Sequence, residues 1–389
     1  MDYQNKLNQT IQQVKPSGIR KFFDIASEMD DVISLSVGEP DFPTPMHIRE
    51  EGIRALERGK TKYTANRGLI ELRQAVATFY ERKYNLHYNG KTDALITVGG
   101  SEAIDLALRT LLNPGDEVLI PQPTFVCYVP ITQVVGGVPV IINTTAEQKF
   151  KITPEDIEKH ITPKTKAIIL PYPCNPTGAV LLKEELEEIA KVIKKHDLMV
   201  ISDEIYSELT YGSAPHVSIA SMDGMQERTI VINGFSKTYS MTGWRLGYAL
   251  GPTEWIAAMT KLHQFAIMSA PTLSQYAALE ALNDGDRDIA YMKQQYDTRR
   301  KMLFEHLNQM GLTCLEPEGT FYAFPSIKST GLTADEFCQR LISEKHVAVV
   351  PGTAFGDCGE GHVRISYSYS EDHLKEGLRR IESFLKELS

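Results

Sequence analysis

Short, mostly apolar runs alternate with amphipathic segments along much of this 389-residue chain. An apolar run bounded by turn formers predicts a buried strand, and apolar residues at helical spacing predict a helix. The predicted helices in the first part of the chain are His47–Arg58, Ile70–Tyr84 and Ser101–Leu112. The predicted strands are Ala94–Val98, Glu117–Pro121, Val138–Ile142, Ala167–Leu170, Met199–Ser202, Thr229–Ile232 and Leu246–Ala249. Continuously apolar strands separated by helices favour an α/β fold, with a mostly parallel seven-stranded sheet covered on both faces.

The rest of the chain has a different pattern. A long helical region is predicted from Glu254 to about Met310. Beyond it, short strands and helices predict a smaller α+β domain. These elements are the strands Tyr322–Phe324, Val347–Val350 and Val363–Ser366 and the helices Thr333–Lys345 and Glu371–Leu388. We therefore expect a large domain over residues 45–285 and a small domain formed by residues 1–44 and 286–389.

The N-terminal segment, Met1 to Ile33, is predicted to be an amphipathic helical arm that leads into a short strand, Val32–Val37. Its apolar stripe consists of Ile19, Phe22, Phe23 and Ile25–Ala26. Such an arm packs either on a partner subunit or on its own domain, and the sequence does not separate the two.

Composition and charge exclude several classes of protein. The chain has 42% apolar and 23% charged residues and a net charge of −9, which argues against nucleic-acid or anionic-membrane partners. Its five cysteines form no C-x-x-C pair, so neither a disulfide framework nor a metal site is expected. The polar N-terminus lacks the apolar core of a signal peptide, and no run is long enough to span a membrane. A cytoplasmic location is expected.

One lysine stands out from this ordinary composition. Lys237 follows the apolar run Thr229–Ile232 inside a loop of small residues, and Arg245 comes eight residues later. Burial disfavours the ammonium form, so a lysine placed here becomes a usable nucleophile for Schiff-base chemistry. From its neighbours alone, a solvated surface lysine is the more frequent case.

Other polar groups follow the ends of predicted strands, where doubly wound sheets bind ligands. Gly99-Gly100-Ser101 opens a helix, whose free N–H groups favour a phosphate, although such a sequence is most often only a turn. Asn175-Pro176-Thr177-Gly178 also reads as a turn. Asp203 ends a buried strand and needs a cationic partner, of which a structural arginine would be the simplest.

Taken in order, five segments of the chain resemble class I aminotransferases that use pyridoxal 5′-phosphate (PLP). The segments are GGSEA, NPTG, SDEIY, FSKTYSMTGWR and RISYS. The resemblance covers essentially the whole chain and is strongest to subgroup I-gamma, near the aromatic and N-acetyl-diaminopimelate aminotransferases. It implies fold type I, a homodimer, and transamination between an L-amino acid and a 2-oxo acid.

The resemblance also implies roles for individual residues around the PLP ring. Lys237 would form the covalent link to PLP, and Asp203 would pair with the protonated pyridine nitrogen. Tyr206 and Asn175 would bind the phenolic oxygen, and Phe125 would stack on the ring. Once the substrate displaces Lys237, the freed amine would move the α-proton as general base and then acid.

Further roles concern the phosphate and the substrate. Gly100, Ser101 and Arg245 would hold the phosphate, and Tyr63 in KYTANRG resembles a tyrosine that the neighbouring subunit donates to it. Arg364 would bind the substrate α-carboxylate as a bidentate pair, helped by Gly38 and Asn175.

Two positions depart from the family pattern. Gly234 stands where a phosphate-binding serine is common, and Ser236 either replaces that serine or is a turn residue. Ser101 stands where some aspartate aminotransferases carry a lysine that pairs with the substrate's side-chain carboxylate. A serine cannot form that ion pair, which favours aromatic or broad neutral substrates, with specificity set at the arm, at Ser101 and around residues 263–267.

Several alternatives stay open. Aspartate, alanine and N-acetyl-diaminopimelate are the other candidate amino donors. A PLP-dependent β-lyase for sulfur amino acids would share the fold and the lysine but would release a thiol, pyruvate and ammonia. A PLP-binding transcription regulator would need a DNA-binding module ahead of this domain, and GEPDF begins within the first forty residues.

Overall fold

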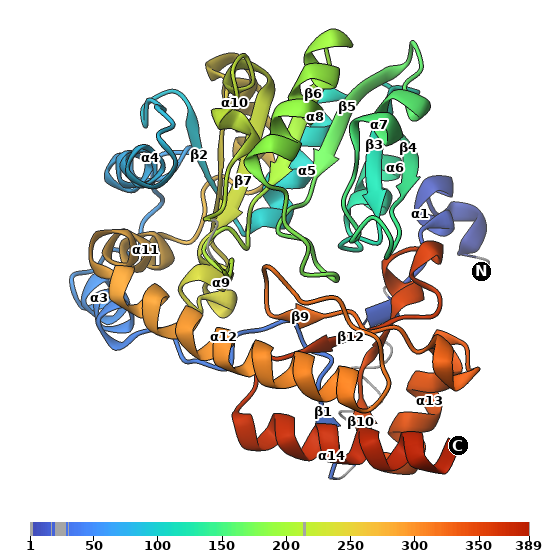
Figure 1. The fold of residues 1–389 in the computed structure, drawn as a ribbon. Helices are drawn as coiled ribbons and strands as arrows, with labels where there is room; N and C mark the ends of the chain where they lie inside the picture. Colours follow the sequence, from blue (N-terminus) through green and yellow to red (C-terminus); the bar gives the residue numbers. More distant parts are fainter. Residues whose placement is uncertain (1–2, 17, 20–28, 30, 213–214, 389) are drawn as a thin grey trace.

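The computed structural model describes residues 3–16, 18–19, 29, 31–212 and 215–388. Its main feature is a seven-stranded sheet in the upper part of Figure 1, with the strand order β2-β8-β7-β6-β5-β3-β4. Strand β8 runs antiparallel to both of its neighbours, and the other neighbouring strands are parallel. The strands are β2 (Ala94–Thr97), β3 (Glu117–Gln122), β4 (Val138–Asn143), β5 (Thr165–Leu170), β6 (Met199–Asp203), β7 (Thr229–Gly234) and β8 (Gly247–Leu250). The predicted α/β fold and the seven predicted strands are confirmed.

The strands are apolar throughout because helices cover both faces of the sheet. On β5, Ala167 and Ile169 pack in one cluster with residues of α5 (Gly100–Leu111), α6 (Tyr128–Val134) and α10 (Thr253–Ala266). The alternate residues Ile168 and Leu170 pack in another cluster with residues of α7 (Pro154–His160) and α8 (Lys183–Lys195). The remaining helices beside this sheet are α3 (Met46–Glu57), α4 (Ile70–Tyr84), α9 (Phe235–Thr238) and α11 (Thr272–Asp284).

The predicted helical region 254–310 consists of three helices, namely α10, α11 and α12 (Asp286–Gln309). Pro271 precedes the first residue of α11, where its missing N–H costs nothing. Gly285 separates α11 from α12, and a Cβ at this position would lie 2.4 Å from the carbonyl oxygen of Ala281. The breaks therefore fall at a proline and at a glycine with no room for a side chain.

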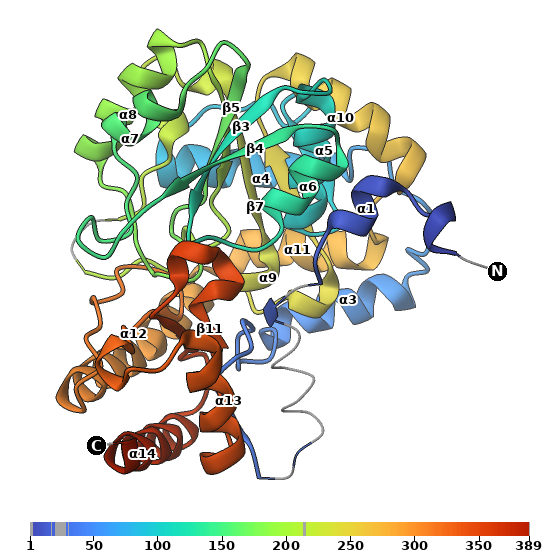
Figure 2. The same cartoon turned by 90° about the vertical axis from the view of Figure 1, so that its right-hand side faces the viewer.

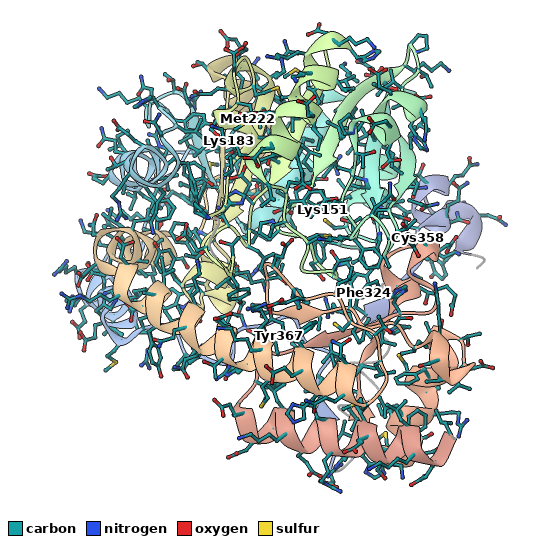
Figure 3. The ribbon with its side chains drawn as sticks, viewed as in Figure 1. Lys151, Lys183, Met222, Phe324, Cys358 and Tyr367 are labelled. Atoms are coloured by element: carbon teal, nitrogen blue, oxygen red, sulfur yellow. The ribbon has the colours of Figure 1, made fainter. Side chains whose placement is uncertain are left out.

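The C-terminal part lies below the large sheet in Figure 1. Strands β9 (Tyr322–Ala323), β11 (Val350–Pro351) and β12 (Val363–Ser366) form an antiparallel sheet, and β1 (Ile33–Ser34) pairs in parallel with β10 (Val347–Ala348). Helices α12, α13 (Ala334–Lys345) and α14 (Glu371–Leu388) surround these strands. Figure 3 shows Tyr367 within this part and Phe324 at its junction with the large sheet. The division at residues 45 and 285 stays a prediction.

The N-terminal segment is described only in part. Helix α1 (Gln9–Gln13) lies beside α6 (Figure 2), and the predicted strand is reduced to β1. The rest of the predicted apolar stripe, Phe22, Phe23 and Ile25–Ala26, lies outside the described residues. Across the described part of the chain, a search for helices with the length and apolarity of a membrane span found none.

Candidate active site

A cavity of about 330 Å³ lies where the carboxyl ends of the large sheet's strands face the C-terminal part. The segments that follow β2, β3, β5, β6 and β7 line it from the large sheet, and β9 and β12 line it from the C-terminal part. It brings together every predicted site residue except Tyr63. The predicted residues that line it are Gly38, Gly100, Ser101, Phe125, Asn175, Asp203, Tyr206, Ser236, Lys237, Arg245 and Arg364.

Lys237 lies in α9, directly after the buried strand β7. Its Nζ donates a hydrogen bond of 2.6 Å to the carbonyl oxygen of Gly38. The pKa of Lys237 is lowered to about 8, mainly by burial and also by the positive charges of Arg364 and Arg245, against a smaller rise from Glu39. The amine is therefore easier to deprotonate than an ordinary lysine, as nucleophilic or general-base chemistry requires.

Asp203 ends β6 and is buried. Its Oδ2 accepts a hydrogen bond of 2.6 Å from the Tyr128 hydroxyl, and Oδ1 accepts one of 3.2 Å from the Ile205 N–H. The pKa of Asp203 is raised to about 6, because burial and, to a smaller extent, the Glu204 charge outweigh the lowering by the two hydrogen bonds. No cation of the described residues pairs with Asp203, so the structural arginine considered from the sequence is not found. The carboxylate thus faces the cavity as an acceptor for a cationic ligand group.

The turn from β2 into α5 provides a backbone cradle. Gly99 has φ +78°, and a Cβ there would also lie 2.7 Å from Nη2 of Arg245, so the position requires glycine. A Cβ at Gly247 would lie 2.6 Å from the carbonyl carbon of Gly99. The start of α5 at Gly100 and the Arg245 guanidinium therefore meet at one end of the cavity, as an anion site requires.

The departure at Gly234 has a steric reason. A Cβ at this position would lie 3.1 Å from the Gly247 Cα and from Ile205 Cδ1, so a serine would crowd the neighbouring strand. Ser236 is buried and lines the cavity, whereas Gly234 does not line it. Ser236 is thus better placed than residue 234 to contribute a hydroxyl to the cavity.

Arg364 is a fully buried cation on β12. Its Nη1 donates to Asn175 Oδ1 at 2.9 Å, and its Nη2 donates to the Ser36 carbonyl oxygen at 2.5 Å. Its Nε has no hydrogen-bond partner among the described residues. Burial lowers the pKa of Arg364, although arginine stays charged in proteins. A buried guanidinium without a carboxylate partner is suited to an anionic ligand.

Tyr206 and Phe125 supply aromatic groups to the same cavity. The Tyr206 hydroxyl lies 2.8 Å from the Tyr322 hydroxyl, and burial raises the Tyr206 pKa well above its ordinary value. The ring of Phe125 lies edge-on to the Tyr128 ring, with 6.0 Å between the ring centres.

Two predicted segments lie away from the cavity of their own chain, namely Tyr63, which was expected to serve the neighbouring subunit, and residues 263–267. Tyr63 is 82% exposed and does not line the cavity. Residues 263–267 do not line it either, because His263 is buried against Glu102 and Phe265 is 85% exposed. The prediction that residues 263–267 contribute to specificity stays a prediction, because it concerns a pocket shared by two subunits.

The comparisons with known proteins decide the family. The sequence profile described as "Aminotransferase class I and II" matches residues 30–381. The chain belongs to this family. An aspartate aminotransferase of Pyrococcus abyssi is 48% identical over 96% of the chain and 97% of its own length. The aromatic-amino-acid aminotransferase 2 of Thermococcus litoralis is 46% identical over 98% of both chains.

A solved structure shows the same fold. The aromatic aminotransferase of Pyrococcus horikoshii matches with a TM-score of 0.91 and 45% identity, over 95% of the present chain and all of the other. The protein is thus a PLP-dependent aminotransferase of fold type I, and the resemblance seen in the sequence is confirmed.

The residues of the aminotransferase cavity fit PLP. A glycine-lined cradle with an arginine suits the phosphate, and a buried carboxylate without a protein cation suits a protonated pyridine nitrogen. A lysine whose pKa is lowered lies in the same cavity. The structure therefore supplies a complementary group for the phosphate, the pyridine nitrogen and the aldehyde of PLP.

The aminotransferase cavity also contains residues that the sequence did not single out as site residues, namely Ile19, Tyr128, Thr242 and Tyr322. Tyr128 follows Phe125 by three residues, a spacing that places both side chains near one another at the start of α6. The strand at Tyr322 was predicted, but the role of its side chain has no local signal, since its hydroxyl contacts Tyr206, which is distant in the sequence.

Proposed function

We propose that this aminotransferase takes L-amino acids with aromatic or other neutral side chains as amino donors and 2-oxoglutarate as acceptor. The supporting observation is the number of cations at the cavity. Among its described lining residues, Lys237, Arg245 and Arg364 alone have cationic side chains. PLP and the substrate α-carboxylate would engage all three, so none of them is left to pair with a side-chain carboxylate.

The distal carboxylate of the acceptor would bind without an ion pair to a side chain of this chain. Ser101 lines the cavity with a hydroxyl and not a cation, and the Thr242 hydroxyl already donates its hydrogen to Glu39. This arrangement accommodates both a carboxylate and a neutral side chain, whereas a lysine at position 101 would favour the carboxylate.

Five residues would hold the PLP ring and its reactive group. Lys237 would form the covalent link, and Asp203 would keep the pyridine nitrogen protonated. Tyr206 and the amide nitrogen of Asn175 would donate to the phenolic oxygen, since the Asn175 carbonyl oxygen already accepts from Arg364. Phe125 would stack on the ring. When bound, PLP supplies an electron sink for the charge left on the α-carbon after proton removal.

The phosphate would lie at the start of α5, held by the backbone of Gly100, by the hydroxyls of Ser101 and Ser236 and by Arg245.

The reaction itself would depend on Lys237 and Arg364. Arg364 would fix the substrate α-carboxylate together with Gly38 and Asn175, which orients the bond to the α-proton. Lys237 Nζ would then take that proton, as its lowered pKa allows. The two side chains lie at the same cavity, with Lys237 Nζ on the Gly38 carbonyl and Arg364 on the neighbouring Ser36 carbonyl.

A homodimer would complete the phosphate site. The segment that carries Tyr63 is joined to the exposed loop around Met268, because Asn66 Nδ2, three residues after Tyr63, donates a hydrogen bond of 2.8 Å to the Met268 carbonyl oxygen. Tyr63 and Phe265 expose 82% and 85% of their surfaces, which is unusual for large apolar side chains. Sedimentation should give a dimer, and Tyr63→Phe should weaken PLP binding without changing the sedimentation coefficient. A fully active monomer would contradict this proposal.

A cytoplasmic location is supported by the thiols. All five cysteines are unpaired in the structure, as expected in a reducing compartment.

The proposal is tested by a half-reaction with the PLP-loaded protein. Phenylalanine, alanine, aspartate and N-acetyl-diaminopimelate are added one at a time, and the absorbance of the lysine-linked cofactor is followed. We expect phenylalanine to convert the cofactor fastest and Lys237→Ala to show no conversion. Faster conversion by aspartate would refute the proposed specificity and agree with the name of the Pyrococcus abyssi relative. No conversion by any donor, with pyruvate released from cysteine, would instead identify a β-lyase.

A further inference from the structure

Tyr322 is buried beside two residues with different proposed tasks. It lies on β9 and is 1% exposed, and its ring lines the cavity. Its hydroxyl contacts the Tyr206 hydroxyl, while its ring contacts the Arg364 guanidinium. One side chain therefore touches both the proposed cofactor-binding tyrosine and the proposed carboxylate-binding arginine.

The contact with Tyr206 is a hydrogen bond between hydroxyl groups, 2.8 Å long. A hydroxyl has one hydrogen to donate. If Tyr206 donates that hydrogen to PLP, its oxygen must accept from Tyr322. The Tyr322 hydroxyl would then fix the position of the Tyr206 hydroxyl and strengthen it as a donor.

The contact with Arg364 is a cation–π interaction. The guanidinium carbon lies 4.3 Å from the centre of the Tyr322 ring and 4.9 Å from the centre of the Phe355 ring. No carboxylate of the described residues pairs with this buried cation, so the two rings supply electrostatic stabilisation in addition to its hydrogen bonds. They also restrict the guanidinium to one plane.

Gly38 leaves the space that the Tyr322 hydroxyl occupies. A Cβ at position 38 would lie 2.1 Å from this oxygen. Gly38 is therefore required for the tyrosine to reach Tyr206, and the same residue accepts the hydrogen bond from Lys237.

We propose that Tyr322 is a positioning residue that holds Tyr206 through its hydroxyl and Arg364 through its ring. This inference rests on the proposed roles of Tyr206 and Arg364. It predicts that the effects of the two contacts can be distinguished, because phenylalanine removes only the hydroxyl contact and leucine removes both contacts.

The test compares Tyr322→Phe and Tyr322→Leu in the PLP-loaded protein with two readouts. The first is the dissociation constant of 3-phenylpropionate relative to that of its uncharged amide, a ratio that reports binding of the carboxylate by Arg364. We expect this ratio to stay within about twofold in Tyr322→Phe and to rise roughly tenfold in Tyr322→Leu. The second readout is the pH titration of the absorbance of the bound cofactor, which should move by up to about one pH unit in both variants.

Tyr296→Phe is the matched control. Tyr296 is fully buried, and its hydroxyl has no partner among the described residues, so the variant removes a buried hydroxyl that touches neither Tyr206 nor Arg364. It should leave both readouts unchanged. If Tyr322→Leu does not fold by circular dichroism, Tyr322→Met replaces it as the variant without a ring.

Two results would overturn the inference. Equal loss of carboxylate binding in Tyr322→Phe and Tyr322→Leu would show that the ring does not hold Arg364. An unchanged titration in Tyr322→Phe would show that the hydroxyl does not act on Tyr206. Because neither readout requires turnover, a wild-type protein that fails to transaminate phenylalanine would refute the proposed specificity and leave this test intact.

Discussion

The buried carboxylate of Asp203 should make the PLP-free protein less stable as pH rises. Its folded pKa of about 6 lies above the ordinary value of 3.8. The folded chain therefore holds this proton more tightly than the unfolded chain, so ionisation favours unfolding. The Asp203 contribution to stability is fully present below about pH 4 and is lost as pH rises to about 6. A shift of about 2 pKa units corresponds to about 3 kcal/mol.

The perturbation is Asp203→Asn, since asparagine keeps the size of aspartate but cannot ionise. The wild type should lose about 3 kcal/mol of unfolding free energy between pH 4 and pH 7 because Asp203 ionises, and the variant should not. The difference in unfolding free energy, variant minus wild type, should therefore rise by about 3 kcal/mol over this range. Urea unfolding at fixed ionic strength and protein concentration measures this difference. PLP added to the wild type should remove the loss near neutral pH, because a protonated pyridine nitrogen would pair with the carboxylate.

A relative stability that stays constant with pH would refute this reasoning. It would mean that the hydrogen bonds from Tyr128 and Ile205 fully compensate the burial of the charge. A change in the opposite direction would mean that Asp203 has a cationic partner in the folded protein.

Three further predictions concern other parts of the structure. Tyr128→Phe removes a donor that lowers the Asp203 pKa, so the pH-dependent loss of stability should increase by about 1–2 kcal/mol in the same urea experiment. Gly99→Ala should weaken PLP binding at least about tenfold in an equilibrium titration, because the new methyl would displace Arg245, and unchanged affinity would exclude this cradle as the phosphate site. His47 is bound by carboxylates on two helices, and although burial lowers its pKa, these partners raise it above 6.5 overall. His47→Gln should therefore cost up to about 1 kcal/mol below pH 6.5 and less as pH rises through the raised pKa, which thermal melts at pH 5.5 and 8.5 would measure.

The sequence was informative wherever a local pattern had one structural solution. The seven strands were predictable because a sheet buried on both faces needs continuous apolar runs, and β5 is such a run. The same apolar runs show where the strands end. Residues that come at or just after these ends, such as Asp203 and Lys237, could therefore be placed at the edge of the sheet that binds ligands. The family resemblance added roles that spacing alone does not supply.

Other features depend on contacts between distant segments, which no local pattern contains. Tyr128 and Asp203 are 75 residues apart, and Tyr206 and Tyr322 are 116 residues apart. Similarly, the tight contacts that a side chain at Gly234 would make are with Ile205 and with residues at the neighbouring strand β8. Such contacts become visible only when the strands are placed side by side.

The position of Arg364 has a consequence for biosynthesis. This residue is close to the C-terminus, and its side chain contacts the Ser36 carbonyl across 328 residues of sequence. A ribosome makes Lys237 and the seven strands of the large sheet well before it makes β12. Segments that fold early during synthesis can therefore form the cofactor end of the cavity while the carboxylate end is still missing. A nascent chain that lacks β12 would have Lys237 but not the arginine that binds the substrate carboxylate, and it gains that arginine only when β12 joins the segment around Ser36.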